Sequence, residues 1–221
     1  MLAIETTGLT WHPREDPHRR VLDGVTMQVA WGSVVALVGR NGSGKTTLLR
    51  VLATLLPPRA GCARVAGEDV ATAPQRVRAA IGLLTEEAGL PDRATPLWHL
   101  RFHALLRGAT WETSRRLALE TLASLGLERV AREPMAALSR GTRQRVAVGR
   151  AIVCDPPVLL LDEPDATLDE EIAAIVRAYL KRRALAGRAV LLATHDPIWA
   201  GRYCDEALAM SDGRIVSREG S

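Results

Sequence analysis

The chain has 221 residues, enough for one or at most two domains. Its 47% hydrophobic and 24% charged residues are typical of a globular protein with a substantial core, which excludes a disordered tail, a fibrous repeat or a disulfide-stapled peptide. The net charge of +4 equals the surplus within residues 86–154, which carry 11 arginines and 7 acidic residues, and it is weak evidence for a nucleic-acid partner.

Two further observations concern membranes. The longest unbroken apolar runs are five residues long, whereas a helix needs about 20 to span a bilayer. The first ten residues, MLAIETTGLT, lack the basic start and the apolar stretch of a signal peptide. We therefore expect no transmembrane helix, and the three scattered cysteines fit a reducing cytosol.

Up to Thr85, the hydrophobic pattern and its Gly and Pro breaks predict short strands with one helix among them. The helix is expected from Gly44 to about Leu56. The predicted strands are Leu2–Ile4, Val21–Val29, Val34–Val38, Cys62–Val65 and Ile81–Leu84.

From Glu86 to Cys154 the pattern becomes helical. One helix is predicted over Thr95–Arg107, and a third begins after Gly141. Between them lies Trp111–Leu125, for which Thr110 is the expected N-cap and Gly126 the C-terminal stop.

Strands return in the last third of the chain, at Val158–Leu161 and Ala189–Thr194. An amphipathic helix is expected between them, and the chain closes with a hairpin of Glu206–Met210 and Arg214–Val216 turning at Asp212-Gly213. The apolar stripe of that helix is Leu168, Ile172, Ile175, Val176 and Tyr179. The pattern predicts an α/β core with a helical insertion.

A glycine-rich segment, GRNGSGKTT, follows the strand Val34–Val38 and precedes a helix. It is a GxxxxGK[ST] pattern in the strand–loop–helix context that this pattern requires. Glycines permit backbone angles closed to other residues, so successive N–H groups converge on phosphate oxygens at the positive end of the helix. The sequence thus predicts a nucleoside triphosphate site formed by Gly39, Arg40, Asn41, Gly42, Ser43, Gly44, Lys45, Thr46 and Thr47.

Three side chains of this segment have expected roles. Lys45 reaches the β- and γ-phosphates, the Thr46 hydroxyl ligates Mg²⁺, and Thr47 adds a phosphate contact. The lysine is informative because the chain has 27 arginines and only two lysines, Lys45 and Lys181. A compact ammonium in a chain that otherwise uses arginine indicates selection by geometry, against the alternative of a structural glycine turn.

Two consecutive carboxylates, Asp162 and Glu163, end the apolar strand Val158–Leu161. Ligands of α/β sheets bind at the carboxyl ends of the strands, and buried carboxylates are costly unless they bind something. Asp162 is therefore expected to hold Mg²⁺ through water, and Glu163 to polarise an attacking water as general base. The alternative is a solvated acidic turn.

The order of four further motifs resembles ABC-type ATPases. LSRGTRQRVAVGRA (Leu138–Ala151) is similar to the signature loop, VLLLDEP (Val158–Pro164) to Walker B, ATLD (Ala166–Asp169) to the D-loop, and ATHD (Ala193–Asp196) to the switch histidine. With the glycine-rich segment, the resemblance extends over nearly the whole chain. It implies a P-loop NTPase (RecA-like) core with an antiparallel β subdomain and a helical subdomain, divided as 1–85, 86–154 and 155–221.

The resemblance also implies roles and partners. His195 senses the γ-phosphate as a hydrogen-bond donor, and Asp169 lies across a dimer interface. Two ATP molecules with Mg²⁺ are held between one subunit's P-loop and the other's signature loop, in a homodimer or a heterodimer. The signature residues in contact with the other subunit's ATP are Leu138, Ser139, Arg140, Gly141 and Thr142.

The sequence departs from the family pattern in places. Arg140 and Thr142 replace a glycine and the glutamine of LSGGQ, whereas Ser139 and Gly141 remain. Glu86 stands where the family has a metal-contacting glutamine, and a carboxylate also ligates Mg²⁺. Trp11 is the candidate aromatic for stacking on adenine, with a core-filling role as the alternative.

The expected function is ATP hydrolysis that powers transport, in the export direction, through a separate membrane permease. The chain would then lie peripherally on the cytoplasmic side of the cell membrane. A soluble ABC-type ATPase acting on nucleic acid or ribosomes, and a non-hydrolytic nucleotide-binding assembly module, are the alternatives. No nucleic-acid partner is expected.

Overall fold

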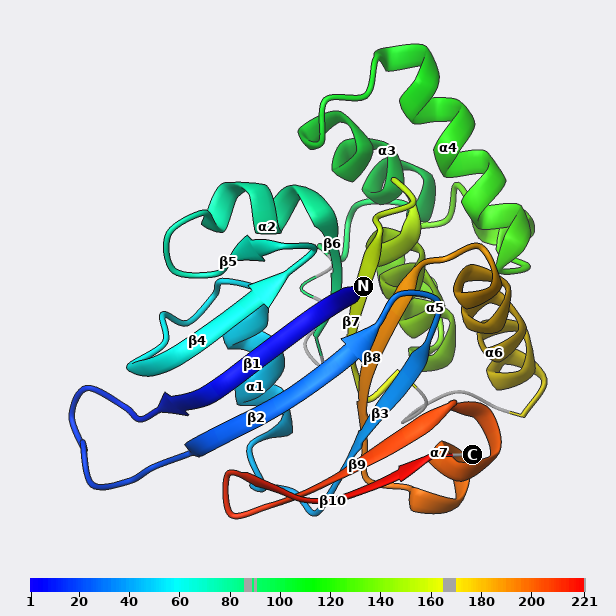
Figure 1. Ribbon diagram of the computed structural model, residues 1–221. Coiled ribbons are helices and arrows are strands. Elements are labelled where there is room, and N and C mark those ends of the chain that lie inside the picture. Colours follow the sequence, from blue (N-terminus) through cyan, green and yellow to red (C-terminus); the bar gives the residue numbers. More distant parts are fainter. Residues whose placement is uncertain (86–88, 90, 165–169, 221) are drawn as a thin grey trace.

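The computed structural model describes residues 1–85, 89, 91–164 and 170–220, and it contains two sheets (Figure 1). The smaller sheet has four antiparallel strands in the order β2-β1-β4-β5. These strands are β1 (Leu2–Trp11), β2 (Leu22–Ala30), β4 (Ala60–Val65) and β5 (Glu68–Asp69).

The larger sheet has six strands in the order β10-β9-β3-β8-β7-β6. Its strands are parallel from β9 to β6, and only the edge strand β10 runs antiparallel to its neighbour. The strands are β3 (Val34–Val38), β6 (Ile81–Leu84), β7 (Val158–Asp162), β8 (Ala189–Thr194), β9 (Glu206–Ser211) and β10 (Arg214–Gly220).

The parallel strands are apolar on both faces because both faces are covered. Alternate residues of β7 belong to different core clusters. Val158 and Leu160 pack with the antiparallel sheet and with helix α1 (Lys45–Leu52), whereas Leu159 and Leu161 pack with helices from residues 96–152 and from the last third of the chain. Burial on both sides explains why β7 and β8 are continuous apolar runs. The polar residue that follows such a run, such as Asp162, emerges at the edge of the sheet.

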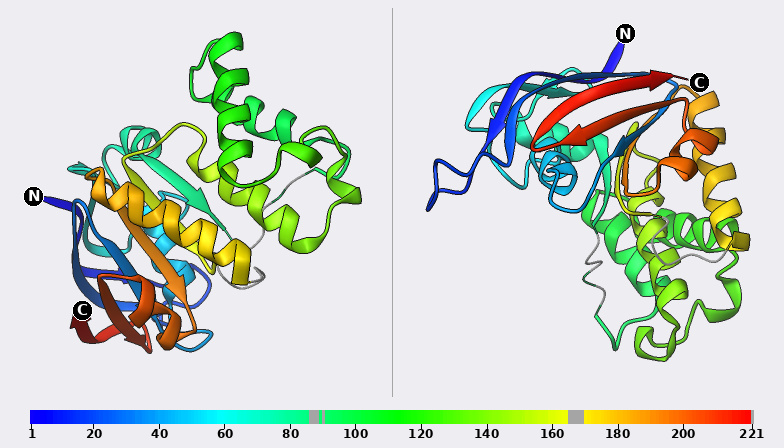
Figure 2. Two further views of the ribbon diagram at one scale, coloured as in Figure 1. Left: turned by 90° about the vertical axis from the view of Figure 1, so that its right-hand side faces the viewer. Right: turned by 90° about the horizontal axis from the view of Figure 1, so that it is seen from below.

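Seven helices lie within the described residues, and α3 and α4 form a lobe that projects from the sheets (Figure 2). Four of the described helices begin at a side-chain cap: Thr95 accepts a hydrogen bond from Trp98 N, the predicted cap Thr110 from Thr113 N, Ser139 from Thr142 N, and Asp196 from Ile198 N and Trp199 N. The helices are α1 (Lys45–Leu52), α2 (Pro74–Ala80), α3 (Pro96–Leu106), α4 (Trp111–Ser124), α5 (Arg140–Ile152), α6 (Glu170–Leu185) and α7 (Pro197–Tyr203).

The elements differ from the sequence-based expectation in boundaries and in two short helices. Helix α1 ends at Leu52 rather than Leu56, because Thr54 adopts a left-handed backbone with φ of 62°. Helix α5 begins at Arg140, before Gly141, because the Ser139 side chain caps it. The helices α2 and α7 were not predicted, since seven residues are too few to show a helical period.

The strand predictions were too short at the amino terminus. Strand β1 continues to Trp11 because it pairs with both β2 and β4, through register shifts that a pattern of alternating residues does not reveal. Leu168, from the predicted apolar stripe of α6, lies outside the described residues. Among the described helices, none is both long enough and apolar enough to cross a bilayer.

Candidate nucleotide-binding site

The glycine-rich segment turns between β3 and α1, as predicted. Gly42 and Gly44 have φ of 83° and 109°, in the region that favours glycine. A Cβ atom on Gly44 would lie 2.7 Å from the Val21 carbonyl oxygen, so both the backbone angle and the space require glycine here. The turn aims the free N–H groups at the start of α1 into open space beside the loop.

The Lys45 side chain is 5% exposed and follows the inside of this loop. Its ammonium donates hydrogen bonds to the carbonyl oxygens of Gly39 at 2.6 Å and Arg40 at 3.2 Å. The loop thus fixes a compact cation at its centre. A guanidinium is planar and larger than an ammonium, so arginine is not an equivalent replacement at this position.

Thr46 and Asp162 meet at the adjoining edge of the sheet. The Thr46 hydroxyl donates a hydrogen bond of 3.1 Å to Oδ1 of Asp162, which is 3% exposed at the end of β7. A hydroxyl and a carboxylate side by side are hard oxygen ligands of the kind that Mg²⁺ prefers, with waters completing its shell. The two residues fit the predicted metal position.

Glu163 and His195 lie next to each other at the ends of β7 and β8. The Glu163 N–H donates to the Ala193 carbonyl at 2.9 Å, and Glu163 holds a left-handed backbone with φ of 46°. Its carboxylate Oε1 lies 3.5 Å from Nδ1 of His195, whose side chain is 57% exposed. A non-glycine residue with positive φ beside a functional group is strain that the surrounding structure must hold in place.

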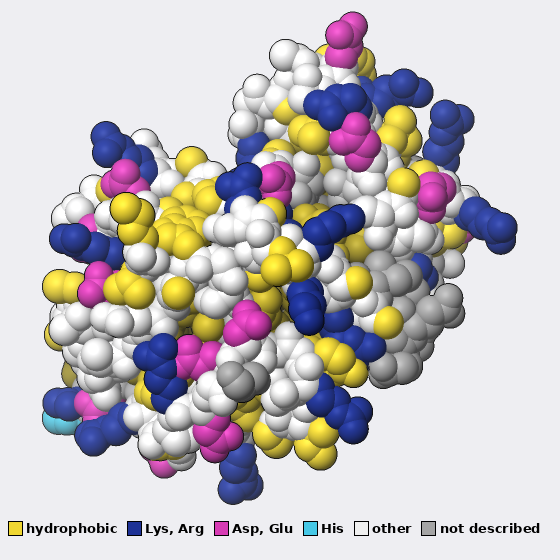
Figure 3. Space-filling model, turned by 45° about the vertical axis from the view of Figure 1, so that its right-hand side comes forward, with side chains coloured by type: hydrophobic (Ala, Val, Ile, Leu, Met, Phe, Trp, Pro, Cys, Tyr) yellow, Lys and Arg dark blue, Asp and Glu magenta, His cyan; other side chains and the backbone are white. Residues whose placement is uncertain are grey.

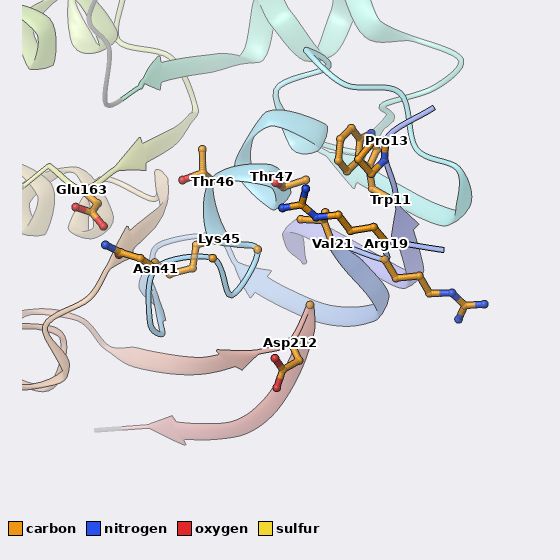
Figure 4. Close-up of a pocket in the computed structure, with 14 residues that line it drawn as sticks. Trp11, Pro13, Arg19, Val21, Asn41, Lys45, Thr46, Thr47, Glu163 and Asp212 are labelled. Atoms are coloured by element: carbon orange, nitrogen blue, oxygen red, sulfur yellow. The ribbon is translucent and has the colours of Figure 1, made fainter. Parts of the chain in front are cut away.

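A cleft of about 680 Å³ is lined by the glycine-rich loop, Thr46 and Glu163, whereas Asp162 and His195 are not in its lining. Figure 4 shows Glu163 and Asn41 toward one end and Trp11 with Pro13 toward the other. Predicted site residues in its lining are Trp11, Asn41, Gly42, Gly44, Lys45, Thr46, Thr47 and Glu163. Trp31, the other tryptophan near the P-loop in sequence, does not line this cleft.

Sequence reasoning missed one wall of the cleft, which the carboxyl-terminal hairpin and the loop after Trp11 supply. Gly213 N donates to the Ser43 carbonyl at 3.0 Å, and Asp23 N donates to the Gly213 carbonyl at 2.9 Å. The turn at Asp212-Gly213 was predicted, but nothing in the sequence places it against the P-loop. The missed lining residues are Pro13, Arg19, Arg20, Val21, Asp212 and Gly213.

Two arginines pair with the carboxylate of Asp23, next to this wall. Asp23 forms ion pairs with Arg20 at 2.8 Å and with Arg214 at 2.5 Å. Hydrogen bonds from these two guanidinium groups hold the pKa of the Asp23 carboxyl below its ordinary value. Both Arg19 and Arg20 line the cleft, and Arg20 is engaged by Asp23, whereas the Arg19 side chain forms no hydrogen bond or ion pair within the described residues.

The predicted signature residues lie elsewhere in the chain, around the first turn of α5. Ser139 caps this helix, and its hydroxyl also lies 2.9 Å from the Thr142 hydroxyl. None of the residues from Leu138 to Thr142 is in the lining of the nucleotide cleft. Two further predicted residues, Glu86 and Asp169, lie outside the described residues.

The cleft suits a triphosphate on its own chemistry. The Ser43 hydroxyl is buried in the P-loop and has no hydrogen-bond partner among the described residues, although buried polar groups are normally paired. A phosphate oxygen would satisfy it, together with the N–H groups at the start of α1.

Fold and cleft together define a P-loop nucleoside triphosphatase, with an α/β core, an antiparallel β sheet and a helical lobe. Comparisons with known proteins narrow this class. The model of the family described as "ABC transporter" matches residues 22–166. The chain belongs to the ABC transporter family and is its ATP-binding, ATP-hydrolysing component.

Three similar proteins illustrate the match. The lipoprotein-releasing system ATP-binding protein LolD of Chromohalobacter salexigens is 36% identical, over 97% of this chain and 93% of its own. The hemin import ATP-binding protein HmuV of Streptomyces coelicolor is 37% identical, over 90% of this chain and 72% of its own. A dimeric post-hydrolysis structure of the ATP-binding cassette MJ0796 with ADP and Pi superposes with a TM-score of 0.90 at 25% identity, covering 98% of both chains.

Proposed function

We propose that this chain works as a dimer that hydrolyses ATP to power export through a separate membrane permease, on the cytoplasmic face of the membrane. The observation that carries the ATPase site is the meeting of Lys45, Thr46 and Glu163 in one cleft, with Asp162 bonded to Thr46. Two distant stretches of sequence, around residues 45 and 162, supply these groups. The membrane partner follows from family membership.

In this proposal the P-loop binds the triphosphate through backbone N–H groups and the ammonium of Lys45. Mg²⁺, held by Thr46 and Asp162, would neutralise phosphate charge. Glu163 orients the attacking water and accepts its proton, and His195 donates a hydrogen bond to the γ-phosphate. Most of the catalysis would therefore be positioning and electrostatic stabilisation.

We propose that the second nucleotide contact comes from the signature loop of a second copy. Two observations support this proposal. Within one chain, the first turn of α5 is not in the lining of the nucleotide cleft. This turn is nevertheless a capped helix amino terminus, which attracts anions. In the dimer, Ser139 and Gly141 would close on the γ-phosphate, with Leu138, Arg140 and Thr142 beside them. Asp169 would lie across the interface, and Glu86 would contact the metal.

We further propose that the permease docks beside residues 86–91 and on the exposed face of α3. Trp98 and Phe102 are stacked there with ring centroids 4.7 Å apart, and their side chains are 48% and 45% exposed. Together with Trp111 they line an apolar hollow of about 330 Å³. Exposed aromatic side chains of this size are typical of protein interfaces.

Export is the direction that we propose, on the similarity of the segment Ile81–Glu87 (IGLLTEE) and of LSRGTRQR to export-type members of the family. The similar proteins include a lipoprotein-releasing system and a hemin import system, so the direction rests on those two motifs. The domain division 1–85, 86–154 and 155–221 is a further proposal, which rests on the order of all the family motifs along the chain. Transport assays in vesicles with the co-purified membrane subunit test the direction.

The Glu163→Gln variant tests the ATPase proposal. We expect it to bind ATP, to lose at least roughly 100-fold in phosphate release, and to accumulate as an ATP-bound dimer measured by light scattering. The Glu120→Gln variant, on the exposed face of α4, is the matched control and should behave as the wild type. Undiminished phosphate release from Glu163→Gln would reject the proposed base.

Docking of the permease is tested separately, on the complex of this chain with its co-purified membrane subunit. Replacing Trp98 and Phe102 by glutamate should lower the amount of substrate transported per ATP hydrolysed. Leu55→Glu, at an exposed leucine outside the α3–α4 lobe, controls for added surface charge. Unchanged transport per ATP in the double variant would contradict the proposed docking face.

A further inference from the structure

Backbone hydrogen bonds join two segments of the helical lobe. The first segment, 91–97, follows residues 86–90, and the second, 131–136, leads into the signature loop. Met135 N donates to the Ala94 carbonyl at 2.8 Å, and Ala136 N donates to the Asp92 carbonyl at 2.9 Å. A third bond runs from Leu97 N to the Ala131 carbonyl at 3.0 Å. Three backbone hydrogen bonds therefore hold the two segments together.

Arg143, in the first turn of α5, fastens these segments to the signature helix. Its Nε donates to the Met135 carbonyl at 3.0 Å, and its guanidinium forms an ion pair with the Asp92 carboxylate. Its own backbone N–H donates to the Ser139 carbonyl at 2.9 Å. Arg143 thus contacts the cap of α5 through its backbone and the segment that follows residue 90 through its side chain.

The charge of Arg143 is unusual for its place. A cation in the first turn of a helix is disfavoured by the helix dipole, and this turn of α5 contains no acidic residue. The Asp92 carboxylate offsets that cost from outside the helix. A role for the Asp92–Arg143 ion pair in orienting the start of α5, rather than in stabilising the helix, explains why a cation stands there.

We propose that Asp92 and Arg143 are positioning residues, which hold Ser139 where the signature loop can meet the nucleotide of a second copy. This inference rests on the proposed dimer. Both residues lie outside the nucleotide cleft.

A merely structural ion pair makes a different prediction. The side chains of Asp92 and Arg143 are 68% and 37% exposed, so their pairing adds little to the stability of the fold. Holding a contact group against a ligand, in contrast, is sensitive to small displacements. The effect of breaking the pair should therefore appear in closure of the dimer, with thermal stability and ATP binding to the monomer unchanged.

The test uses Glu163→Gln as parent and measures the protein concentration for half-maximal dimerisation in Mg-ATP by light scattering. Asp92→Asn and Arg143→Met should each raise this concentration roughly three- to tenfold, as expected for loss of one positioning contact. The melting temperature and the ATP affinity of the monomer serve as readouts of structure. Asp92→Glu, which keeps the charge, should restore most of the closure.

Arg116→Ala, which breaks an exposed ion pair with Glu120 on α4, is the matched control and should leave dimerisation unchanged. The inference is overturned if Asp92→Asn and Arg143→Met dimerise like the parent, or if their defect appears only together with a lower melting temperature. A parent that fails to dimerise at all overturns the proposed function, and this inference with it.

Discussion

The hydroxyl of Thr46 donates a hydrogen bond of 3.1 Å to the carboxylate of Asp162, across 116 residues of sequence. One group starts helix α1 and the other ends strand β7, so the bond exists only because β3 and β7 both lie alongside β8. Parallel strands bring their carboxyl ends to one edge of a sheet. The fold therefore builds the metal position from its topology.

This contact predicts the behaviour of Thr46→Val, which keeps the shape of the side chain and removes its hydroxyl. The proposed Mg²⁺ site would lose the hydroxyl ligand beside Asp162, so we expect Mg²⁺-dependent ATP hydrolysis to fall by roughly tenfold or more. Binding of ATP measured in EDTA should change little. Thr46→Ser retains the hydroxyl and should stay near wild-type activity, and equal activity of Thr46→Val would contradict the assignment.

The two glycines of the P-loop separate backbone strain from crowding. In Gly44→Ala the new Cβ meets the Val21 carbonyl oxygen at 2.7 Å and φ is 109°, whereas Gly42→Ala has φ of 83° and nothing within 4 Å. We expect Gly42→Ala to lower the free energy of unfolding by about 1 kcal/mol, and Gly44→Ala by about 2–4 kcal/mol. Urea denaturation measures both, and equal losses would show that crowding at Val21 contributes nothing.

Trp11 lines the far end of the cleft from Glu163 and is predicted to stack on the base of the nucleotide. We expect Trp11→Ala to weaken ATP binding by roughly ten- to thirtyfold, and Trp11→Tyr by threefold or less, because stacking needs only an aromatic face. The matched control is Trp31→Tyr, at a partly buried tryptophan outside the cleft. Titration with a fluorescent ATP analogue measures these affinities. Similar affinities of Trp11→Ala and the wild type would favour a purely core-filling role.

His103 makes the helical lobe sensitive to acid. Burial, reinforced by the charges of Arg107 and Arg150, lowers the pKa of His103 from 6.5 to about 4. The unfolded chain then binds more protons than the folded chain between these values, so stability is full above pH 6.5 and declines as the pH falls toward 4. Urea denaturation measures the free energy of unfolding at pH 7.5 and at pH 4.5. We expect the loss between these two pH values to be smaller in His103→Gln than in the wild type, by about 1–3 kcal/mol.

Leu106→Gln, at an exposed leucine of the same helix, provides the control for this effect. Because it removes no titratable group, it should leave the pH dependence of unfolding as it is in the wild type. An unchanged slope in His103→Gln would contradict the account of its burial.

Local chemistry predicted the P-loop and the Thr110 cap. The glycines, Lys45 and Thr46 stand in one short stretch, so their arrangement follows from a strand, a turn and a helix start. Thr95, Thr110 and Ser139 cap helices through bonds that span three residues. The predicted meeting of Asp162 with this loop required one additional assumption, that the apolar strands are parallel.

The remaining wall of the cleft depends on long-range contacts that residue types do not encode. Gly213 bonds to Ser43 through backbone groups only, so no side chain signals that the last hairpin supports the P-loop. The arginines after Trp11 stand out in sequence as a basic loop, yet only the pairing of β1 with β2 places them beside the nucleotide. The signature residues are a third case, because their proposed ligand belongs to another molecule.

The most direct test of the central claim is a crystal structure of the Glu163→Gln protein with Mg²⁺ and ATP. We predict two copies around two nucleotides, each triphosphate within the loop Gly39–Thr47 of one copy and in contact with Ser139 of the other. A nucleotide bound away from Lys45, or a P-loop nucleotide with the signature loops of both copies remote from it, would contradict the account.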